Sequence, residues 1–168
     1  MVAPRPLPFV VGLVLAVTFA ATLGLAQGFR YEVHDEDHIP PHVYKERRDS
    51  VLASLAPNAV AVVFSADVRN RQNDVDYEYR QNSDLLYLTG APEPSTTLLL
   101  VPRGVRVGER TVREILFVRE RDRRTEQWQG VMMGPAEAMQ FLRPDTALPV
   151  KELGSIMDKV LQNTDTVY

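Results

Sequence analysis

The three histidines of the chain, His34, His38 and His42, are the first residues whose types and spacing could do chemistry. They lie four residues apart among acidic residues, and on a helix this spacing would place the imidazoles on one face, where they could bind a metal ion. However, a Pro-Pro pair at residues 40–41 would interrupt a helix at this point, and no second cluster of ligands completes a coordination shell. We therefore expect no metal site here and interpret residues 27–42 as an extended polar leader.

A second group of polar residues lies in the stretch DYEYRQNSDLLYLTGAPEP, where a polar segment runs directly into an apolar one. It includes Tyr77, Tyr79, Arg80 and Asp84, which we interpret as structural. A buried pair of Arg80 with Asp84, within reach of the tyrosine hydroxyls, would satisfy its own hydrogen bonds. Such a group would hold a loop at the edge of the sheet. The strand-like apolar run at residues 85–88 would then enter the core.

The composition excludes several classes of function. The chain has 168 residues, of which 45% are hydrophobic and 24% charged, and these values suit one ordinary globular domain. Its formal net charge of −3 gives no basic surface for nucleic acid or anionic lipid. The chain has no cysteine, so disulfides, thiolate metal sites and cysteine nucleophiles are excluded.

The first 26 residues have the pattern of a signal peptide. Arg5 supplies the positive charge, an uncharged apolar run extends from Phe9 to Leu25, and Gly24 and Ala26 place small residues before a cleavage site after Ala26. An uncleaved membrane anchor is the alternative, because the apolar run is close to spanning length. We favour cleavage, because two threonines dilute the run. In either case we expect the rest of the chain to be exported, to the periplasm or out of the cell.

The remaining chain predicts alternating helices and buried strands. Helical spacing of apolar residues begins at Val43 and stops before Pro57. Short apolar runs predict strands at residues 59–64, 96–101 and 112–118, the last two joined by a hairpin-type connection. A short helix is expected to begin at Pro135, and an amphipathic helix is expected over residues 148–162.

The chain ends on NTDTVY, which predicts a turn and the first residues of a further strand. Val167 and Tyr168 would have no room to pair. We therefore expect the polypeptide to be a fragment, with a domain at residues 43–168 that is incomplete at its C-terminus.

Two motifs carry a resemblance to a known family. In the first, Tyr-x-Tyr-Arg-Gln-Asn-Ser-Asp is followed by Tyr-x-Thr-Gly and x-Glu-Pro. The second is ILFVRERDRRTEQWQG, which keeps the family's spacing of Arg119, Arg121, Asp122, Glu126, Trp128 and Gly130. Over residues 43–168 the chain resembles the N-terminal domain of Xaa-Pro aminopeptidases (aminopeptidase P), in the creatinase/prolidase "pita-bread" metallopeptidase group. The resemblance implies an α/β fold with a mixed β-sheet flanked by helices, of the ribonuclease-H-like kind, ahead of a catalytic domain.

The resemblance also implies an activity for the parent protein, which would remove the N-terminal residue of peptides whose second residue is proline. Members of the family use two metal ions, commonly manganese, held by two Asp, one His and two Glu of the catalytic domain. No histidine follows His42, so this chain lacks the family's histidine ligand. We expect the chain alone to bind no metal and to be inactive. A prolidase-type dipeptidase fragment and a non-catalytic binding module remain alternatives.

Assembled oligomers of the family bring the N-terminal domain of one subunit to the mouth of another subunit's active site, and Asp74 and Trp128 match positions at that mouth. A carboxylate can attract a peptide's ammonium group, and an indole offers a flat apolar face. The alternatives are a turn residue at Asp74 and a half-buried aromatic at Trp128. We interpret Arg121, Asp122 and Glu126 as structural, in a charged run whose ion pairs, if solvated, are worth little. The implied partners are proline-containing peptides, the catalytic domain and further copies of the chain.

Overall fold

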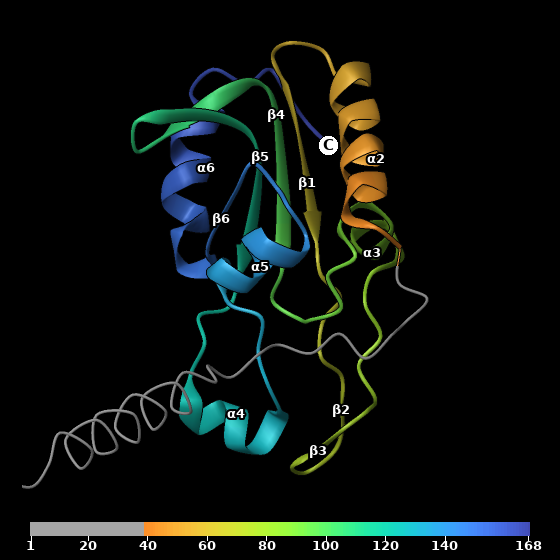
Figure 1. Ribbon diagram of the computed structural model, residues 1–168. Coiled ribbons are helices and arrows are strands. Elements are labelled where there is room, and N and C mark those ends of the chain that lie inside the picture. Colours follow the sequence, from red (N-terminus) through yellow and green to blue (C-terminus); the bar gives the residue numbers. More distant parts are fainter. Residues whose placement is uncertain (1–38) are drawn as a thin grey trace, which may run out of the picture. The chain divides into compact units, whose positions relative to one another are not determined.

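The computed structural model describes residues 39–168 (Figure 1). The predicted signal peptide, most of the predicted leader, and with them His34 and His38, lie outside the described residues. The main feature is a five-stranded mixed sheet in the order β6-β5-β4-β1-β7. Its strands are β1 (Ala59–Phe64), β4 (Thr97–Val107), β5 (Arg110–Val118), β6 (Thr146–Pro149) and β7 (Thr166–Val167). The central strands β1, β4 and β5 are antiparallel, and the outer strands β6 and β7 run parallel to their neighbours.

In the part of the chain that the structure describes, six helical segments accompany the sheet: α2 (Pro41–Ser54), α3 (Ser83–Thr89), α4 (Arg123–Gln129), α5 (Pro135–Phe141), the 3₁₀ turn η1 (Val150–Glu152) and α6 (Leu153–Leu161). Figure 1 shows α6 on one side of the sheet and α2 and α3 on the other. This mixed sheet flanked by helices confirms the predicted α/β fold class. Within residues 39–168, no helix is long and apolar enough to cross a membrane.

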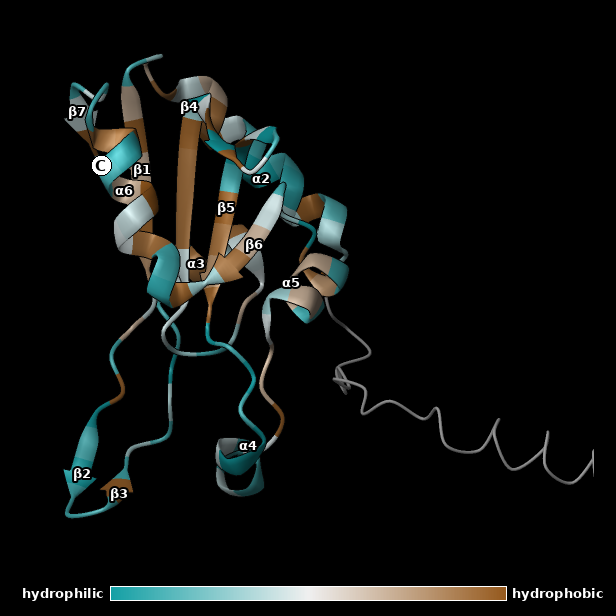
Figure 2. Cartoon of the chain, turned by 90° about the vertical axis from the view of Figure 1, so that its left-hand side faces the viewer, coloured by the Kyte–Doolittle hydropathy of each residue, from teal (hydrophilic) through white to brown (hydrophobic). Residues whose placement is uncertain are grey.

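Figure 2 shows by colour that the central strands are largely hydrophobic, and most of their apolar residues are buried, although Phe64 at the end of β1 is exposed. Successive side chains of a strand point to opposite faces, and β4 therefore supplies both layers. One layer contains Leu99, Ile115 and Phe117, which pack against Ile156 and Val160 of α6. The other face is covered by the helices opposite α6. Helices on both faces explain why the strands are continuously apolar rather than alternating.

Most of the predicted elements are confirmed, and three boundaries differ. The strands at β4 and β5 extend through most of the expected connection, so only a tight turn at Gly108 separates them. The predicted helix over residues 148–162 begins only at Leu153, because the preceding residues form β6 and pair with β5, Leu148 opposite Phe117. Residues 39–40 are not helical, and Pro41 is the first residue of α2, a position where its missing N–H is not needed. The helix therefore begins two residues before the predicted Val43, and Pro41 and His42 belong to it rather than to the predicted leader.

The apolar run at residues 85–88, predicted to be strand-like, lies in the helix α3. The side chain of Asn82 caps this helix and accepts a hydrogen bond from the backbone N–H of Asp84 at 2.8 Å. Gly90 ends it in the left-handed conformation, with φ of 72°. Leu85 and Leu88 still enter the core, but they do so from a helix. A four-residue apolar run cannot be assigned by periodicity alone, and the two capping residues decide the outcome.

The prediction that Val167 and Tyr168 have no room to pair was also wrong. Val167 lies opposite Val60 in the parallel pair of β7 with β1. The backbone N–H of Tyr168 donates to the carbonyl of Val60 at 2.9 Å, and the N–H of Val62 donates to the carbonyl of Tyr168, also at 2.9 Å. The turn after α6 brings this segment back beside β1, so two residues suffice to add a strand.

Candidate functional site

Two segments project from the same end of the sheet, as both Figure 1 and Figure 2 show. The first is the hairpin arm, residues 65–82, which contains β2 (Asn70–Gln72) and β3 (Val75–Asp76). The second is the α4 loop, residues 119–134, which contains α4. The hairpin arm carries Asp74 and the α4 loop carries Trp128. The fold therefore presents both predicted mouth residues at one end of the molecule, on separate projections.

Asp74 lies in the tight turn between β2 and β3, and its side chain is exposed. The turn is stabilised by Asn70, whose side-chain amide donates to the carbonyl of Asn73 at 2.9 Å and to the carboxylate of Asp76 at 3.1 Å. Asn73 itself has φ of 52°, a conformation that asparagine tolerates better than most residues. Asp74 is thus a turn residue, and its carboxylate faces solvent.

Trp128 is 89% exposed, so it is not the half-buried aromatic of the alternative interpretation. It lies on α4, a seven-residue helix with no buried residue. Tryptophan is enriched at protein interfaces, because one part of its side chain is apolar and its N–H is polar. The indole therefore has its whole face available for contact.

Polar contacts at its base hold the α4 loop in place. Arg121 donates through Nε to Glu126 at 2.7 Å and through Nη1 to Glu137 of α5, also at 2.7 Å. The same Glu126 carboxylate accepts from the backbone N–H of Met132 at 3.1 Å. The hydrogen bond from Arg121 lowers the pKa of Glu126, and the same bond raises the pKa of Arg121. These charges are paired with defined partners, and Arg121, Glu126 and Glu137 are only part-exposed.

Asp122 has a separate structural role as the N-cap of α4. Its carboxylate accepts from the backbone N–H of Arg124 at 3.2 Å and from the hydroxyl of Thr125 at 2.8 Å. The hydroxyl contact lowers the pKa of Asp122. A short aspartate side chain before a helix satisfies backbone donors that the helix leaves free. The structural interpretation of this residue therefore has a specific mechanism.

The hydrogen-bond centre predicted at the base of the hairpin arm exists, but different residues form it. Arg80 and Asp84 are both exposed, so the predicted buried pair was wrong. The centre is Gln81, which is 8% exposed. Its carbonyl oxygen accepts from the hydroxyl of Tyr79 at 2.7 Å and from the backbone N–H of Ala66 at 3.1 Å. A neutral amide supplies both a donor and an acceptor without the cost of burying a charge.

The two tyrosines of the motif differ in environment. Tyr79 is partly buried beside Gln81, and burial raises the pKa of its phenol. Tyr77 is 58% exposed, and the guanidinium of Arg71 lies 6.0 Å from the centre of its ring. Tyr77 also contributes a backbone bond, its N–H donating to the carbonyl of Arg69 at 2.8 Å. Only Tyr79 therefore belongs to the buried hydrogen-bond centre.

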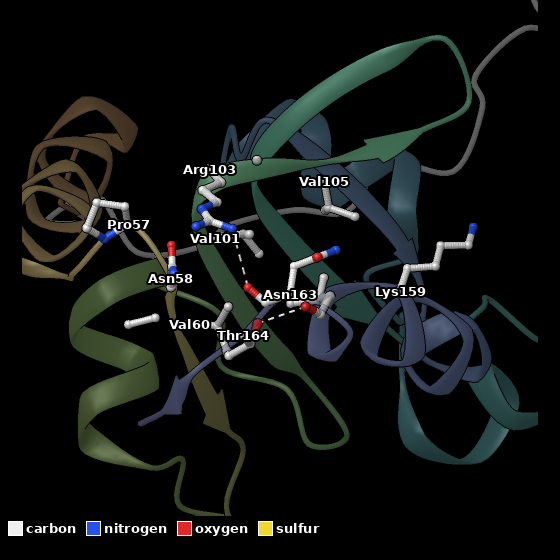
Figure 3. A pocket seen from close by; sticks show the side chains of 12 residues that line it. Pro57, Asn58, Val60, Val101, Arg103, Val105, Lys159, Asn163 and Thr164 are labelled. Carbon is white, nitrogen blue, oxygen red and sulfur yellow. Dashed lines mark hydrogen bonds between the residues drawn. The ribbon is translucent and has the colours of Figure 1, made fainter.

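A pocket of about 170 Å³ opens at the other end of β1 (Figure 3). Arg103 reaches across it and donates to the carbonyl of Asn163 at 3.5 Å. The lining residues include no carboxylate and no imidazole, so this pocket offers no ligand set for a metal ion. More widely, residues 39–168 contain no group of three or more acidic, histidine or cysteine side chains that could hold one. His42 is an exposed residue of α2.

Comparison with known proteins gives this geometry a context. A sequence profile described as "Aminopeptidase P, N-terminal domain" matches residues 44–168. The chain belongs to the aminopeptidase P N-terminal domain family. It is 35% identical over 130 residues to a Xaa-Pro aminopeptidase of Haemophilus influenzae, covering 77% of this chain and 29% of the relative. It is 33% identical over 125 residues to the Xaa-Pro aminopeptidase of Escherichia coli, covering 74% of this chain and 27% of that protein.

Solved structures of aminopeptidase P share the fold. The Pseudomonas aeruginosa aminopeptidase PepP superposes with a TM-score of 0.69 at 36% identity, over 78% of this chain and 28% of that chain. Aminopeptidase P from E. coli with the inhibitor Pro-Leu gives a TM-score of 0.69 at 32% identity, over 79% of this chain and 29% of that one. The aminopeptidase P N-terminal domain described here therefore spans less than a third of the length of these relatives.

Proposed function

We propose that the chain is the N-terminal, assembly and specificity domain of an exported Xaa-Pro aminopeptidase. The observation that carries the proposal is the family match over residues 44–168, which corresponds to under a third of relatives named Xaa-Pro aminopeptidase. The domain helps to form the mouth of the peptide-binding site. The parent enzyme removes the residue that precedes proline at the N-terminus of a peptide.

The chemistry of such an enzyme depends on two divalent metal ions, with manganese as the expected metal. The residues of this chain do not fit such a centre, because the described part offers no cluster of ligands and no histidine follows His42. The proposal therefore assigns the metal to a catalytic domain outside this chain. The 168-residue chain, purified alone, is expected to show no turnover of a Xaa-Pro-Xaa peptide with or without added manganese. Turnover by the purified chain would overturn this assignment.

Asp74 and Trp128 are the residues that we assign to the peptide mouth. Their exposure at the same end of the sheet supports this role. The carboxylate of Asp74 attracts the free ammonium group of a peptide, and the indole of Trp128 packs against an apolar side chain or a proline ring. In an assembled oligomer these side chains face the active site of a neighbouring subunit.

Substitution in the full-length enzyme tests this role. Asp74→Ala and Trp128→Ala are each expected to raise KM for tripeptides and longer peptides while kcat stays unchanged. Solvent-exposed contacts are worth up to about 1 kcal/mol, which corresponds to a rise in KM of up to about fivefold. Glu109→Ala is the matched control, because Glu109 is exposed in the β4–β5 turn, outside both projections. An unchanged KM in both variants would contradict the assignment of Asp74 and Trp128 to the peptide mouth.

The choice of peptides in the same assay separates the alternative functions. Cleavage of Xaa-Pro dipeptides but not of longer peptides would identify a prolidase-type dipeptidase. No cleavage of either, with manganese present, would identify a non-catalytic binding module.

Export is the remaining part of the proposal, and it rests on the N-terminal sequence pattern. A signal peptidase that cuts after Ala26 leaves a mature protein that begins at Gln27. N-terminal sequencing of the protein from the exported fraction tests this expectation. A protein that retains residues 1–26 and sediments with membranes would instead identify a membrane anchor.

A further inference from the structure

Glu93 lies between the two projections, in the segment that joins α3 to β4. Its backbone carbonyl accepts a hydrogen bond from the side-chain amide of Gln81 at 2.8 Å. The same amide donates to the carbonyl of Ala91 at 3.1 Å. Because Gln81 is also bonded to Ala66 and Tyr79 of the hairpin arm, these bonds attach the base of the hairpin arm to the segment that contains Glu93.

The side chain of Glu93 makes contacts in the opposite direction, to the α4 loop. One carboxylate oxygen accepts from the backbone N–H of Met133 at 2.7 Å, and the other accepts from Nη2 of Arg119 at 3.3 Å. Through Nη1, Arg119 also donates to the side chain of Gln129 on α4 at 3.2 Å. The carboxylate of Glu93 therefore holds both ends of the α4 loop, and its exposed fraction is 17%.

These contacts matter because packing does not hold α4. The helix buries no residue, and a helix of seven residues is marginal in water without tertiary support. Its orientation consequently depends on the polar contacts at the base of the loop. Hydrogen bonds between charged groups in part-buried positions are stronger and more directional than exposed ion pairs.

We propose that Glu93 is a positioning residue that connects the hairpin arm to the α4 loop and holds Asp74 and Trp128 at one separation. One residue can do this because its backbone contacts one projection and its side chain contacts the other. The consequence for peptide binding rests on the proposed function, whereas the positioning itself does not.

The composition of the chain makes the inference directly measurable. Trp128 is the single tryptophan and there are no cysteines, so a Val75→Cys substitution creates one labelling site on β3, where Val75 is 52% exposed. A thiol-reactive dansyl group at this site accepts excitation energy from Trp128. Time-resolved energy transfer in the labelled chain then reports the distribution of distances between the two projections.

Glu93→Ala is expected to broaden this distribution and to lower the fluorescence anisotropy of Trp128. Glu93→Gln keeps an acceptor for the N–H of Met133 but loses the charge that binds Arg119. Its distance distribution is therefore expected to be narrower than that of Glu93→Ala and broader than that of the parent chain. Glu120→Ala is the matched control, because Glu120 belongs to the same loop but pairs with Lys151 at 2.7 Å on the surface. This control is expected to leave both signals unchanged.

A second variant protects the test against a failure to fold. Arg119→Gln removes the ion pair and leaves Glu93 intact, and circular dichroism checks that each variant retains its secondary structure. Distance distributions in folded Glu93→Ala and Arg119→Gln as narrow as in the parent chain would overturn the proposal. If Glu93→Ala does not fold, the result for Arg119→Gln alone decides it.

Kinetics of the full-length enzyme separate this inference from the proposed function. If Arg119→Gln broadens the distribution and raises KM for tripeptides without changing kcat, both stand. If it broadens the distribution while KM stays unchanged in this variant and in Trp128→Ala, the positioning role stands and the mouth assignment fails.

Discussion

Arg48 of α2 and Glu114 of β5 form an ion pair in which the side chains are 1% and 0% exposed. Nε of Arg48 lies 3.0 Å from a carboxylate oxygen of Glu114, and its other nitrogens donate to the carbonyls of Leu88 at 3.0 Å and Arg143 at 3.2 Å. The ammonium of Lys45 forms an ion pair with the second carboxylate oxygen of Glu114 at 2.9 Å. Among residues 39–168, no donor meets that oxygen at a hydrogen-bonding angle. One arginine thus joins α2 to the sheet, to the end of α3 and to the loop after α5.

The first prediction concerns this buried pair. Arg48→Met is expected to lower the free energy of unfolding by about 3–5 kcal/mol, because it leaves the carboxylate of Glu114 buried without its principal partner. The double variant Arg48→Met/Glu114→Leu is expected to recover most of the loss, since both charges are then absent. Urea unfolding of the chain measures both. Glu46→Ala, an exposed change on the same helix, serves as control, and a loss in Arg48→Met no larger than in this control would contradict the prediction.

The second prediction concerns the helix cap at Asn82. Asn82→Ala is expected to destabilise the chain by about 1 kcal/mol, because α3 loses the side chain that accepts from its first backbone N–H groups. Asn82→Asp keeps an acceptor at the same position and is expected to lose much less. Thermal or urea unfolding provides the measurement, with Ser83→Ala at the neighbouring exposed position as control. Equal stabilities of the alanine and aspartate variants would show that the cap does not matter.

The third prediction compares two glycines. Gly90 has φ of 72°, and an added Cβ would lie 2.7 Å from ring atoms of Tyr44, so Gly90→Ala is expected to cost at least about 1–2 kcal/mol of backbone strain. Gly154 lies in α6 with open space around an added Cβ, and Gly154→Ala is expected to stabilise the chain by about 0.5–1 kcal/mol. The same change from glycine to alanine is thus expected to destabilise the chain at residue 90 and to stabilise it at residue 154. A stabilising Gly90→Ala would exclude the left-handed cap at this position.

The fourth prediction concerns acid. The hydrogen bond from Arg121 lowers the pKa of Glu126, and the hydroxyl of Thr125 lowers the pKa of Asp122. Carboxylates with a lowered pKa in the folded state stabilise it fully above their unfolded pKa, and this stabilisation is lost as the pH falls through the folded pKa. The unfolded values are 4.5 for glutamate and 3.8 for aspartate. The α4 loop is therefore expected to loosen below about pH 4.

The fluorescence of Trp128 measures this local transition, and far-UV circular dichroism monitors the sheet in the same titration. Glu126→Gln removes one of the two carboxylates with a lowered pKa and is expected to make the Trp128 signal less dependent on pH. A Trp128 signal that is constant from neutral pH to pH 3 while the sheet remains folded would count against the polar attachment of α4.

Local patterns in the sequence were sufficient for much of the fold. The apolar run at residues 59–64 became β1 with those same bounds, because a short valine-rich run without polar interruptions suits a strand covered on both faces. The helix at Pro135 was also predictable, because proline at a first helical position needs no N–H. At α3 the deciding signals were Asn82 and Gly90, and both were present in the sequence. The prediction of a strand at residues 85–88 followed instead the apolar run between them, which is too short to show a period.

The sequence by itself determined the family and the main strands, because both depend on residue types close together in the chain. Tertiary structure alone decided the partners of the buried polar groups. Glu114 is 66 positions from Arg48, and Met133 is 40 positions from Glu93. No local pattern specifies such pairs, because the cost of burying a charge or an amide is offset only by the group that the folded chain brings beside it. For the same reason the neutral Gln81, and not the charged Arg80, is the centre of the hydrogen bonds that hold the hairpin arm.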